Sequence, residues 1–370
     1  MLALAERINS IVSLFLATVT LAVCLLAPHA RAQSFDPLPP SDQTSYSAEE
    51  QQQIAAFVLK RVALIGGEDT EARETARSEL LTPLRRAGVS VAFRRAVRSA
   101  AIDELSSLTD SSDEHIAINA LFVLAEIADD ASRLVIQRHT ADDSQAVRYA
   151  AIGALKRIFS VVNTFSPAID PGRVSEMVAH LNTRLTDETD ATVADAITRA
   201  LLQASQIRRD GFETPATQAI IGVASRVGPR LRAAKDGDRP LALISCVRVA
   251  EALTGKLQSP GAVKPEIARA AAGFGGEMLG HLAFLANDGS LPEDRRWELD
   301  LARLSERCVV FARSKLGGNL SEPGLATMLE RGENSKFFQE TQQEVLSLSG
   351  DPTNLPTEVM QRIKDALEDQ

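Results

Sequence analysis

A recurring pattern of branched and small apolar residues constrains this chain more than any other feature of its sequence. The segment ADDSQAVRYAAIGAL at residues 141–155 places Val147, Ala151 and Leu155 one helical turn apart, behind an acidic loop. Similar sets recur at intervals of tens of residues: Ala72, Ala76 and Leu80; Ile116, Ala120 and Leu124; Val193, Ile197 and Leu201; and, less closely, Val247–Leu253. A repeat of this period indicates stacked helical hairpins, because one hairpin cannot bury its own apolar face.

The composition suits closely packed helices. Hydrophobic residues make up 45% of the chain but aromatic residues only 4%, so the apolar content is mostly Ala, Leu, Val and Ile. Small side chains such as Ala150, Ala151 and Ala154 let neighbouring helix axes approach to the lower end of the usual ~8–10 Å. The net charge is −9 with both signs interspersed, which argues against a nucleic-acid partner.

Helical periodicity continues to the end of the chain, interrupted by short loops rich in Asp, Gly, Pro, Ser and Asn. Ser47 and Glu50 form a capping-box pattern at the first helix. The sequence predicts helical repeats over residues 47–256 and a helical region without a clear repeat over 257–370. The expected fold class is all-α: a right-handed α–α superhelix with a less regular C-terminal part.

Residues 1–32 have the layout of a cleaved secretory signal peptide. Arg7 precedes an apolar run, Ile8 to Ala27, which is followed by a proline and a small-x-small triplet. We therefore expect a mature chain that begins at Gln33, with a flexible linker over 33–46, in the periplasm or outside the cell. Two alternatives stay open. The run is about as long as a membrane span, so it could be retained as an anchor, and Cys24 could carry a lipid.

Residues 130–155 resemble a HEAT repeat, especially the short type found in phycobilisome-lyase-like repeats. A short helix, the Asp-rich turn at 142–143 and the segment Val147–Leu155 carry the resemblance, which is good over 113–160 and weak over 69–110 and 187–254. It implies a solenoid that serves as an interaction scaffold.

The same resemblance implies that an Asp and an Arg link each repeat to the next. Arg148 and Arg248 match this arginine, but Ala117 and Ala194 stand at the corresponding positions of other repeats. We therefore expect the ladder of links to be broken.

No set of residues predicts catalysis, a cofactor or a metal. The histidines have no ligand spacing, and no Gly-x-Ser-x-Gly segment occurs. The glycine-rich stretch 273–280 lacks the Lys-Ser/Thr of a phosphate loop, so we interpret it as close helix packing. The sequence thus predicts a protein that is not an enzyme and holds neither cofactor nor metal.

Four arginines are candidates for a surface that binds a protein partner. Arg94, Arg95 and Arg98 belong to the densest basic cluster, in which Arg94 and Arg98 lie one turn apart; Arg148 follows the repeat pattern. The alternative interpretation is an ordinary solvated helix face.

Two cysteines remain after removal of residues 1–32. Cys246 and Cys308 could form a disulfide in an oxidising compartment. They could equally be two small buried residues on separate helices.

The sequence favours an exported, non-catalytic protein–protein interaction scaffold. One alternative is a small-molecule-binding or lyase-like repeat protein, which would require His115, His139 or His180 to converge with acidic residues. Another is an envelope structural protein anchored by an uncleaved N-terminal helix; the membrane would be a partner only in that case.

Overall fold

The computed structural model describes residues 38–165 and 169–368, and residues Pro40–Gln370 form one compact unit. The described residues are helical throughout, joined by turns and short loops. The expected signal peptide, residues 1–32, lies outside the described residues.

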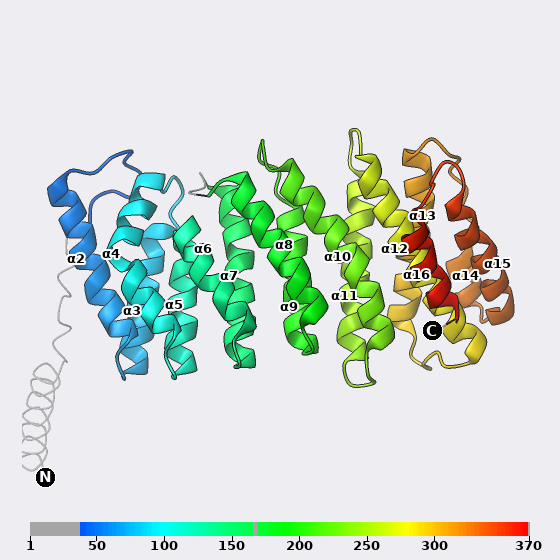
Figure 1. Cartoon of the computed structure of the whole chain (residues 1–370), viewed down its shortest axis with the longest axis horizontal. Coiled ribbons are helices and arrows are strands. Elements are labelled where there is room, and N and C mark those ends of the chain that lie inside the picture. The colour runs from blue at the N-terminus through cyan, green and yellow to red at the C-terminus, as the bar shows by residue number, and fades with distance from the viewer. Residues whose placement is uncertain (1–37, 166–168, 369–370) are drawn as a thin grey trace, which may run out of the picture. The chain divides into compact units, whose positions relative to one another are not determined.

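The helices form two-helix units stacked in chain order (Figure 1). The stack starts with α2 (Ala48–Ile65) and α3 (Thr70–Leu84), continues with α4 (Val91–Thr109) and α5 (Glu114–Ile127), α6 (Asp130–Arg138) and α7 (Gln145–Thr164), α8 (Pro171–Asp187) and α9 (Ala191–Ser205), α10 (Glu213–Ala233) and α11 (Arg239–Gln258), and reaches α12 (Pro265–Asp288) and α13 (Arg296–Lys315). Three further helices follow, namely α14 (Leu325–Glu330), α15 (Asn334–Leu346) and α16 (Thr357–Glu368), and two single 3-10 turns lie at His139–Ala141 and Ser347–Ser349.

Contacts between equivalent helices make this stack a solenoid. The first helix of one hairpin packs on the first helix of the next, as in α8–α10–α12, and the second helices pack likewise in α5–α7–α9–α11–α13. The repeated sets of the sequence fall on α3, α5, α7, α9 and α11, which all belong to the row of second helices. The expected all-α repeat solenoid is therefore confirmed.

The acidic loops before these helices supply their N-caps. The side chains of Asp69, Asp113 and Asp190 each accept a hydrogen bond from a backbone N–H in the first turn of α3, α5 and α9. Ser144 does the same for α7. These bonds satisfy N–H groups that have no partner inside the helix, so each of these four second helices has a defined starting residue. The capping box of Ser47 and Glu50 is also present.

The stacking does not stop at residue 256. Helices α12 and α13 continue the two rows, and α15 and α16 then pack on α12. The glycine-rich stretch lies in the middle of α12 and serves close packing: a Cβ at Gly275 would lie 2.6 Å from the backbone oxygen of Ser305 on α13. The packing interpretation of this stretch is confirmed.

Residues of the expected linker pack on α4, the first helix of the second hairpin. Ser41 is buried, and its carbonyl oxygen accepts a hydrogen bond of 2.8 Å from the N–H of Ser90. The ring of Tyr46 lies 6.1 Å from that of Phe93. Proline-rich sequence favoured a flexible linker here, but these tertiary contacts hold residues 41–46 against α4.

Candidate functional site

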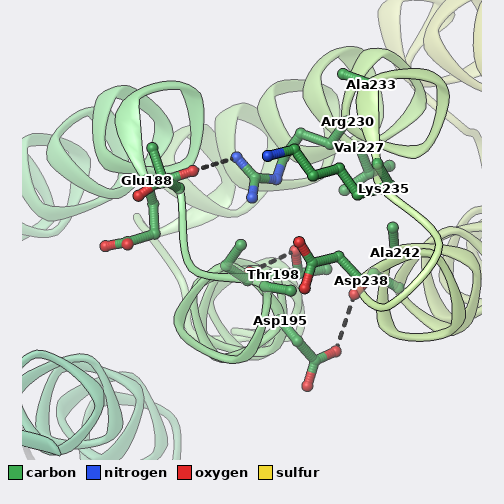
Figure 2. A pocket seen from close by; sticks show the side chains of 14 residues that line it. Glu188, Asp195, Thr198, Val227, Arg230, Ala233, Lys235, Asp238 and Ala242 are labelled. Carbon is green, nitrogen blue, oxygen red and sulfur yellow. Dashed lines mark hydrogen bonds between the residues drawn. The ribbon is translucent and has the colours of Figure 1, made fainter. Parts of the chain in front are cut away.

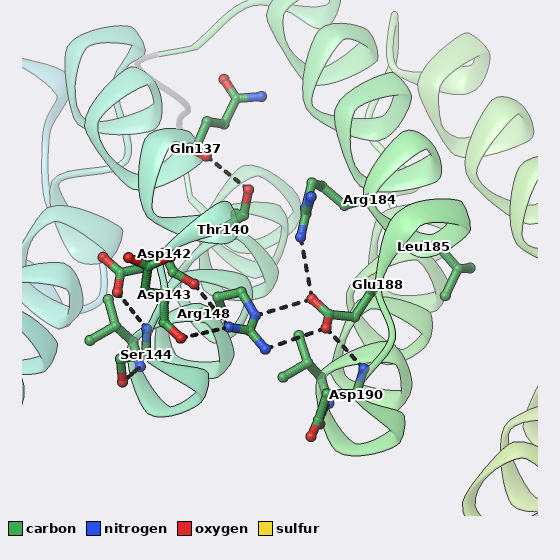
Figure 3. Close-up of polar contacts among 12 residues, drawn as sticks. Gln137, Thr140, Asp142, Asp143, Ser144, Arg148, Arg184, Leu185, Glu188 and Asp190 are labelled. Atoms are coloured by element: carbon green, nitrogen blue, oxygen red, sulfur yellow. Dashed lines mark hydrogen bonds and ion pairs between the residues drawn. The ribbon is translucent and has the colours of Figure 1, made fainter. Parts of the chain in front are cut away.

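The junction between the hairpins α6–α7 and α8–α9 is built around Arg148 (Figure 3). Its Nε lies 3.2 Å from Oε2 of Glu188, and its Nη1 donates to the carbonyl oxygens of Asp142 (2.9 Å) and Asp143 (3.1 Å). Arg184 also pairs with Glu188, at 3.3 Å. Because Glu188 is buried, this pairing spares its carboxylate an uncompensated desolvation. Arg148 thus links two repeats and does not stand free for a partner.

Arg73 makes the corresponding link at the start of the stack, and sequence reasoning missed it. It follows Ala72 as Arg148 follows Val147, and it is buried. Its Nη2 lies 3.4 Å from Oδ2 of Asp113, the N-cap of α5 in the next repeat. The signal was available, because Arg73 stands at the arginine position of the earliest repeated set.

The ladder is interrupted at Ala117 and Ala194, as expected, but other ion pairs replace it. Between α5 and α7, the buried Glu126 pairs with Arg157 at 2.8 Å and with Arg85, from α3's C-terminus, at 2.6 Å. Between α9 and α11, a buried aspartate accepts a hydrogen bond of 2.9 Å from a serine and pairs with two arginines; these residues are Asp195, Ser245, Arg199 and Arg248. Both of these junctions therefore bury one carboxylate between arginines from different helices.

A cavity of about 370 Å³ opens beside Ala194, between α9, α10 and α11 (Figure 2). An arginine at this position would extend toward the loop before α11, as Arg148 does toward the loop before α9. The alanine side chain leaves that space empty. We call this space the Ala194 cavity. Its wall includes small or short side chains such as Ala191, Thr198 and Ala242.

Polar groups of both signs face the Ala194 cavity. Arg230 donates from Nη1 to the carbonyl oxygens of Glu188 (2.6 Å) and Leu185 (3.1 Å), and burial lowers its pKa. Lys235 and Asp238 are exposed at the rim, and their side chains make no hydrogen bond or ion pair with any residue in the described ranges. The cavity rim therefore carries an exposed amine and an exposed carboxylate, and the charge of Asp238 partly offsets the effect of burial on the pKa of Arg230.

The basic cluster on α4 is not the surface that the sequence suggested. Arg94 is fully buried, and it donates to the carbonyl oxygens of Leu84 (3.0 Å) and Glu126. These oxygens belong to the last turns of α3 and α5, which lack helical partners and need a donor. The one-turn spacing correctly places Arg94 and Arg98 on one face, but Arg94 points into the core and only Arg98 reaches solvent.

The other two arginines of the cluster keep contact with solvent. Arg98 pairs with Asp129 at 3.2 Å. Arg95 is exposed and lines an open hollow between α2 and α4. Among the three arginines of α4, only Arg95 has a side chain without a hydrogen bond or ion pair to another residue of the described structure.

The two cysteines are separate, buried thiols. Cys246 on α11 donates to the carbonyl oxygen of Val227, and Cys308 on α13 to that of Ala250. Burial raises the pKa of both thiols, that of Cys308 to about 12. The disulfide considered from the sequence is not formed, because each thiol is fixed by packing against a different backbone segment.

One histidine does meet acidic residues. Nδ1 of His139 lies 3.2 Å from Asp142, and its Nε2 lies 3.4 Å from Asp110. His180 reaches the neighbouring Thr140, with Nε2 2.7 Å from Oγ1. This contact sits in the buried turn between α6 and α7. Across the described residues, no group of three or more His, Cys, Asp or Glu is placed to hold a metal ion.

The described helices also include none with the length and apolar character needed to cross a membrane.

Comparisons with known proteins give only distant likeness. No family model and no curated protein matches the chain. Among solved structures, an engineered protein is similar over 70% of this chain and 97% of its own, with 18% identity and a TM-score of 0.38. A designed armadillo repeat protein in complex with the peptide (KR)4 covers 84% of this chain and 98% of its own, with 13% identity and a TM-score of 0.27.

Kap121p is a third similar structure. It covers 88% of this chain, with 12% identity and a TM-score of 0.40, and this chain spans 36% of its length. Such values say nothing about what this chain binds. The solenoid is established by the stacking of its own hairpins, and the short phycobilisome-lyase-like type of repeat stays a prediction.

Proposed function

We propose that this chain is an exported, non-catalytic scaffold that binds a partner protein along its stacked repeats. The observation that carries the proposal is the Ala194 cavity, where a repeat lacks its linking arginine and two exposed charged side chains, Lys235 and Asp238, lie at the rim. A solenoid repeats its faces along one direction, which suits an extended contact with another chain. The non-catalytic role follows from the sequence, in which no nucleophile, base or ligand set could be assembled.

Cross-linking tests the scaffold role directly. Tagged protein is treated with an amine-reactive cross-linker in its native envelope fraction, captured, and identified by mass spectrometry. We expect one stoichiometric partner, with cross-links that include Lys235 at the cavity rim. Absence of any stoichiometric partner would contradict the proposal.

A matched pair of substitutions locates the contact. Ala194→Arg fills the Ala194 cavity, whereas Ala146→Arg adds the same side chain at an exposed position in the first turn of α7. We expect capture to be lost with Ala194→Arg and retained with Ala146→Arg, with both variants folded by circular dichroism. Equal capture by the two variants would show that the partner binds elsewhere.

Export rests on residues 1–32. Intact-mass measurement of the protein from its host is expected to give a chain that begins at Gln33. A full-length chain in the membrane fraction would instead support the anchored structural protein.

A second candidate function is small-molecule binding. It is favoured by His139, which contacts Asp110 and Asp142 as this alternative required, and by the volume of the Ala194 cavity, which lies in the range of small-molecule sites. Native mass spectrometry of the purified protein decides it: a bound small molecule in place of a protein partner would support this second function.

A further inference from the structure

A second cavity, of about 700 Å³, lies where α9 and α11 end and α10 and α12 begin. Its lining includes the cations Arg208, Lys256 and Lys264, together with the loop at residues 259–263 that connects α11 to α12. We call this feature the basic groove. It is separate from the Ala194 cavity, with which it shares no lining residue.

The basic groove has an unbalanced charge. No aspartate or glutamate is among its lining residues. None of its three cations makes an ion pair with a residue that the structure describes. Glu266 lines an adjoining hollow together with Lys264. In a chain of net charge −9, a concave site with cations alone is therefore a local reversal of sign.

Lys256 shows that this arrangement is unfavourable without an anion. Its Nζ donates to the carbonyl oxygen of Ser205, at 2.6 Å, and so caps the C-terminus of α9. Burial lowers the pKa of this amine, and the charge of Arg208 lowers it further. Two cations thus repel each other in a partly desolvated place, and an anion between them would relieve both effects.

The neighbouring backbone also tolerates an anion. Lys264 is the N-cap residue of α12 and gives its first turn no side-chain hydrogen bond, in contrast to the aspartate caps of α3, α5 and α9. The first-turn N–H groups of α12 therefore carry their partial positive charge without a side-chain acceptor. This feature adds to the three cations, on which the inference depends.

We propose that the basic groove binds an acidic segment of the partner protein, through the carboxylates of Asp or Glu side chains. This inference rests on the scaffold function proposed above and names the chemistry of its partner. The cations come from three different elements around an open cavity that can hold several side chains, which favours a peptide over a single small anion. Arg208 and Lys264 are exposed and reach the peptide first, while Lys256 contributes its charge from the floor.

Fluorescence anisotropy with the full chain tests the groove. The probes are labelled hexaglutamate and, as the neutral isostere, labelled hexaglutamine. We expect hexaglutamate to bind, with an affinity that falls as sodium chloride is added, and hexaglutamine not to bind. Equal binding of the two peptides, or binding of neither, would overturn the inference.

Paired charge reversals place the site. Arg208→Glu with Lys264→Glu should weaken hexaglutamate binding by about tenfold. Arg86→Glu with Lys315→Glu makes the same change in net charge at exposed positions outside the groove and should leave the affinity within about twofold. Equal weakening in both pairs would mean that only the overall charge matters, and would overturn the assignment of the basic groove as the binding site. Thermal melts confirm that both variants fold.

Three further outcomes separate the alternatives. Displacement of hexaglutamate by inorganic phosphate at an ionic strength where chloride has no effect would identify a site for a free anion and overturn the peptide inference. Undiminished capture of the cross-linked partner by the Arg208→Glu, Lys264→Glu variant would overturn the peptide-binding role of the basic groove, but it would not contradict the proposed scaffold function. Absence of any partner with both the wild type and the variant would contradict the proposed scaffold function. The hexaglutamate measurement would still test whether the basic groove binds acidic peptides.

Discussion

At the scale of single residues, arginine has two different tasks in this protein. Some arginines pair with a buried carboxylate between repeats, as Arg148 does with Glu188. Others donate to backbone oxygens at helix ends, as Arg94 does, and Arg230 with Leu185 and Glu188. The planar guanidinium suits both tasks, because it offers five donors in a fixed geometry. A lysine would satisfy fewer of these acceptors.

The first prediction concerns Arg94. Arg94→Met removes a buried donor and leaves the carbonyl oxygens of Leu84 and Glu126 without it, so we expect a loss of about 2–4 kcal/mol in the free energy of unfolding. The neighbouring exposed change Arg95→Met should shift it by no more than about 0.5 kcal/mol. Urea unfolding followed by circular dichroism measures both. Equal stability of the two variants would disprove the structural role of Arg94.

The second prediction concerns pH and His281. This side chain is buried with neither ring nitrogen hydrogen-bonded, and burial, with Arg239 and Arg232 nearby, lowers its pKa to about 4. The unfolded chain, with a pKa near 6.5, therefore binds more protons between pH 6.5 and 4. The contribution of neutral, buried His281 to the free energy of unfolding is complete above pH 6.5 and is lost as the pH falls toward 4.

The variant His281→Phe isolates this contribution. Between pH 7 and pH 5 the wild-type histidine should cost about 2 kcal/mol of stability, and the phenylalanine variant should lack this part of the loss. Glu277, one turn earlier, has a raised pKa and acts in the opposite direction, so the difference between variant and wild type is the quantity to measure. Chemical denaturation at pH 7 and pH 5 measures this difference. Parallel pH profiles of the variant and the wild type would refute the attribution of the pH dependence to His281.

At the scale of helices, α12 depends on the absence of side chains. Its glycines let neighbouring elements approach: Gly275 faces the backbone of α13, and Gly280 faces Ile363 on α16. Glycine inside a helix costs about 1 kcal/mol relative to alanine. Here the cost is offset by close contact with two neighbouring helices, so the stretch is a packing device and not a hinge.

The third prediction compares two helical glycines. In Gly275→Ala the new Cβ would meet the oxygen of Ser305 at 2.6 Å, and a backbone atom cannot easily move, so we expect a destabilisation of about 1–3 kcal/mol. In Gly153→Ala no atom lies within 4 Å of the new Cβ, and helix propensity should stabilise the protein by about 0.5–1 kcal/mol. Thermal melts compare them, and the same sign for both changes would contradict this packing.

At the scale of the whole solenoid, contacts are local along the stack. Each hairpin contacts the hairpins before and after it, and the C-terminal helices α15 and α16 pack on α12. Stability in such a chain is close to a sum over repeats and their interfaces. A local defect is therefore expected to act on its neighbours and to fade with distance along the stack.

The fourth prediction follows from this arrangement. Hydrogen exchange of Gly275→Ala, followed by mass spectrometry, should be faster in α10–α13 and in α15–α16, with little change in α2–α5. Gly153→Ala serves as the control and should show no such acceleration. A uniform acceleration along the chain would show that the solenoid unfolds as one cooperative unit.

The sequence by itself determined the helices, their N-caps and the hairpin repeat. Periodicity and capping act within a few residues, so the caps Asp69, Asp113, Ser144 and Asp190 are recognisable from their immediate neighbours along the chain. The interruption of the ladder at Ala117 and Ala194 is visible in the same way.

Only the tertiary structure decided which faces are covered and which charges meet. A helix in a solenoid has neighbours on several sides, so helical spacing groups Arg94 with Arg98 but does not show that Arg94 points inward. Likewise Arg148 and Glu188, or Arg157 and Glu126, are far apart along the chain and meet only because successive hairpins stack. The Ala194 cavity and the basic groove arise in the same way: each is enclosed by several helices, and no local pattern encodes it.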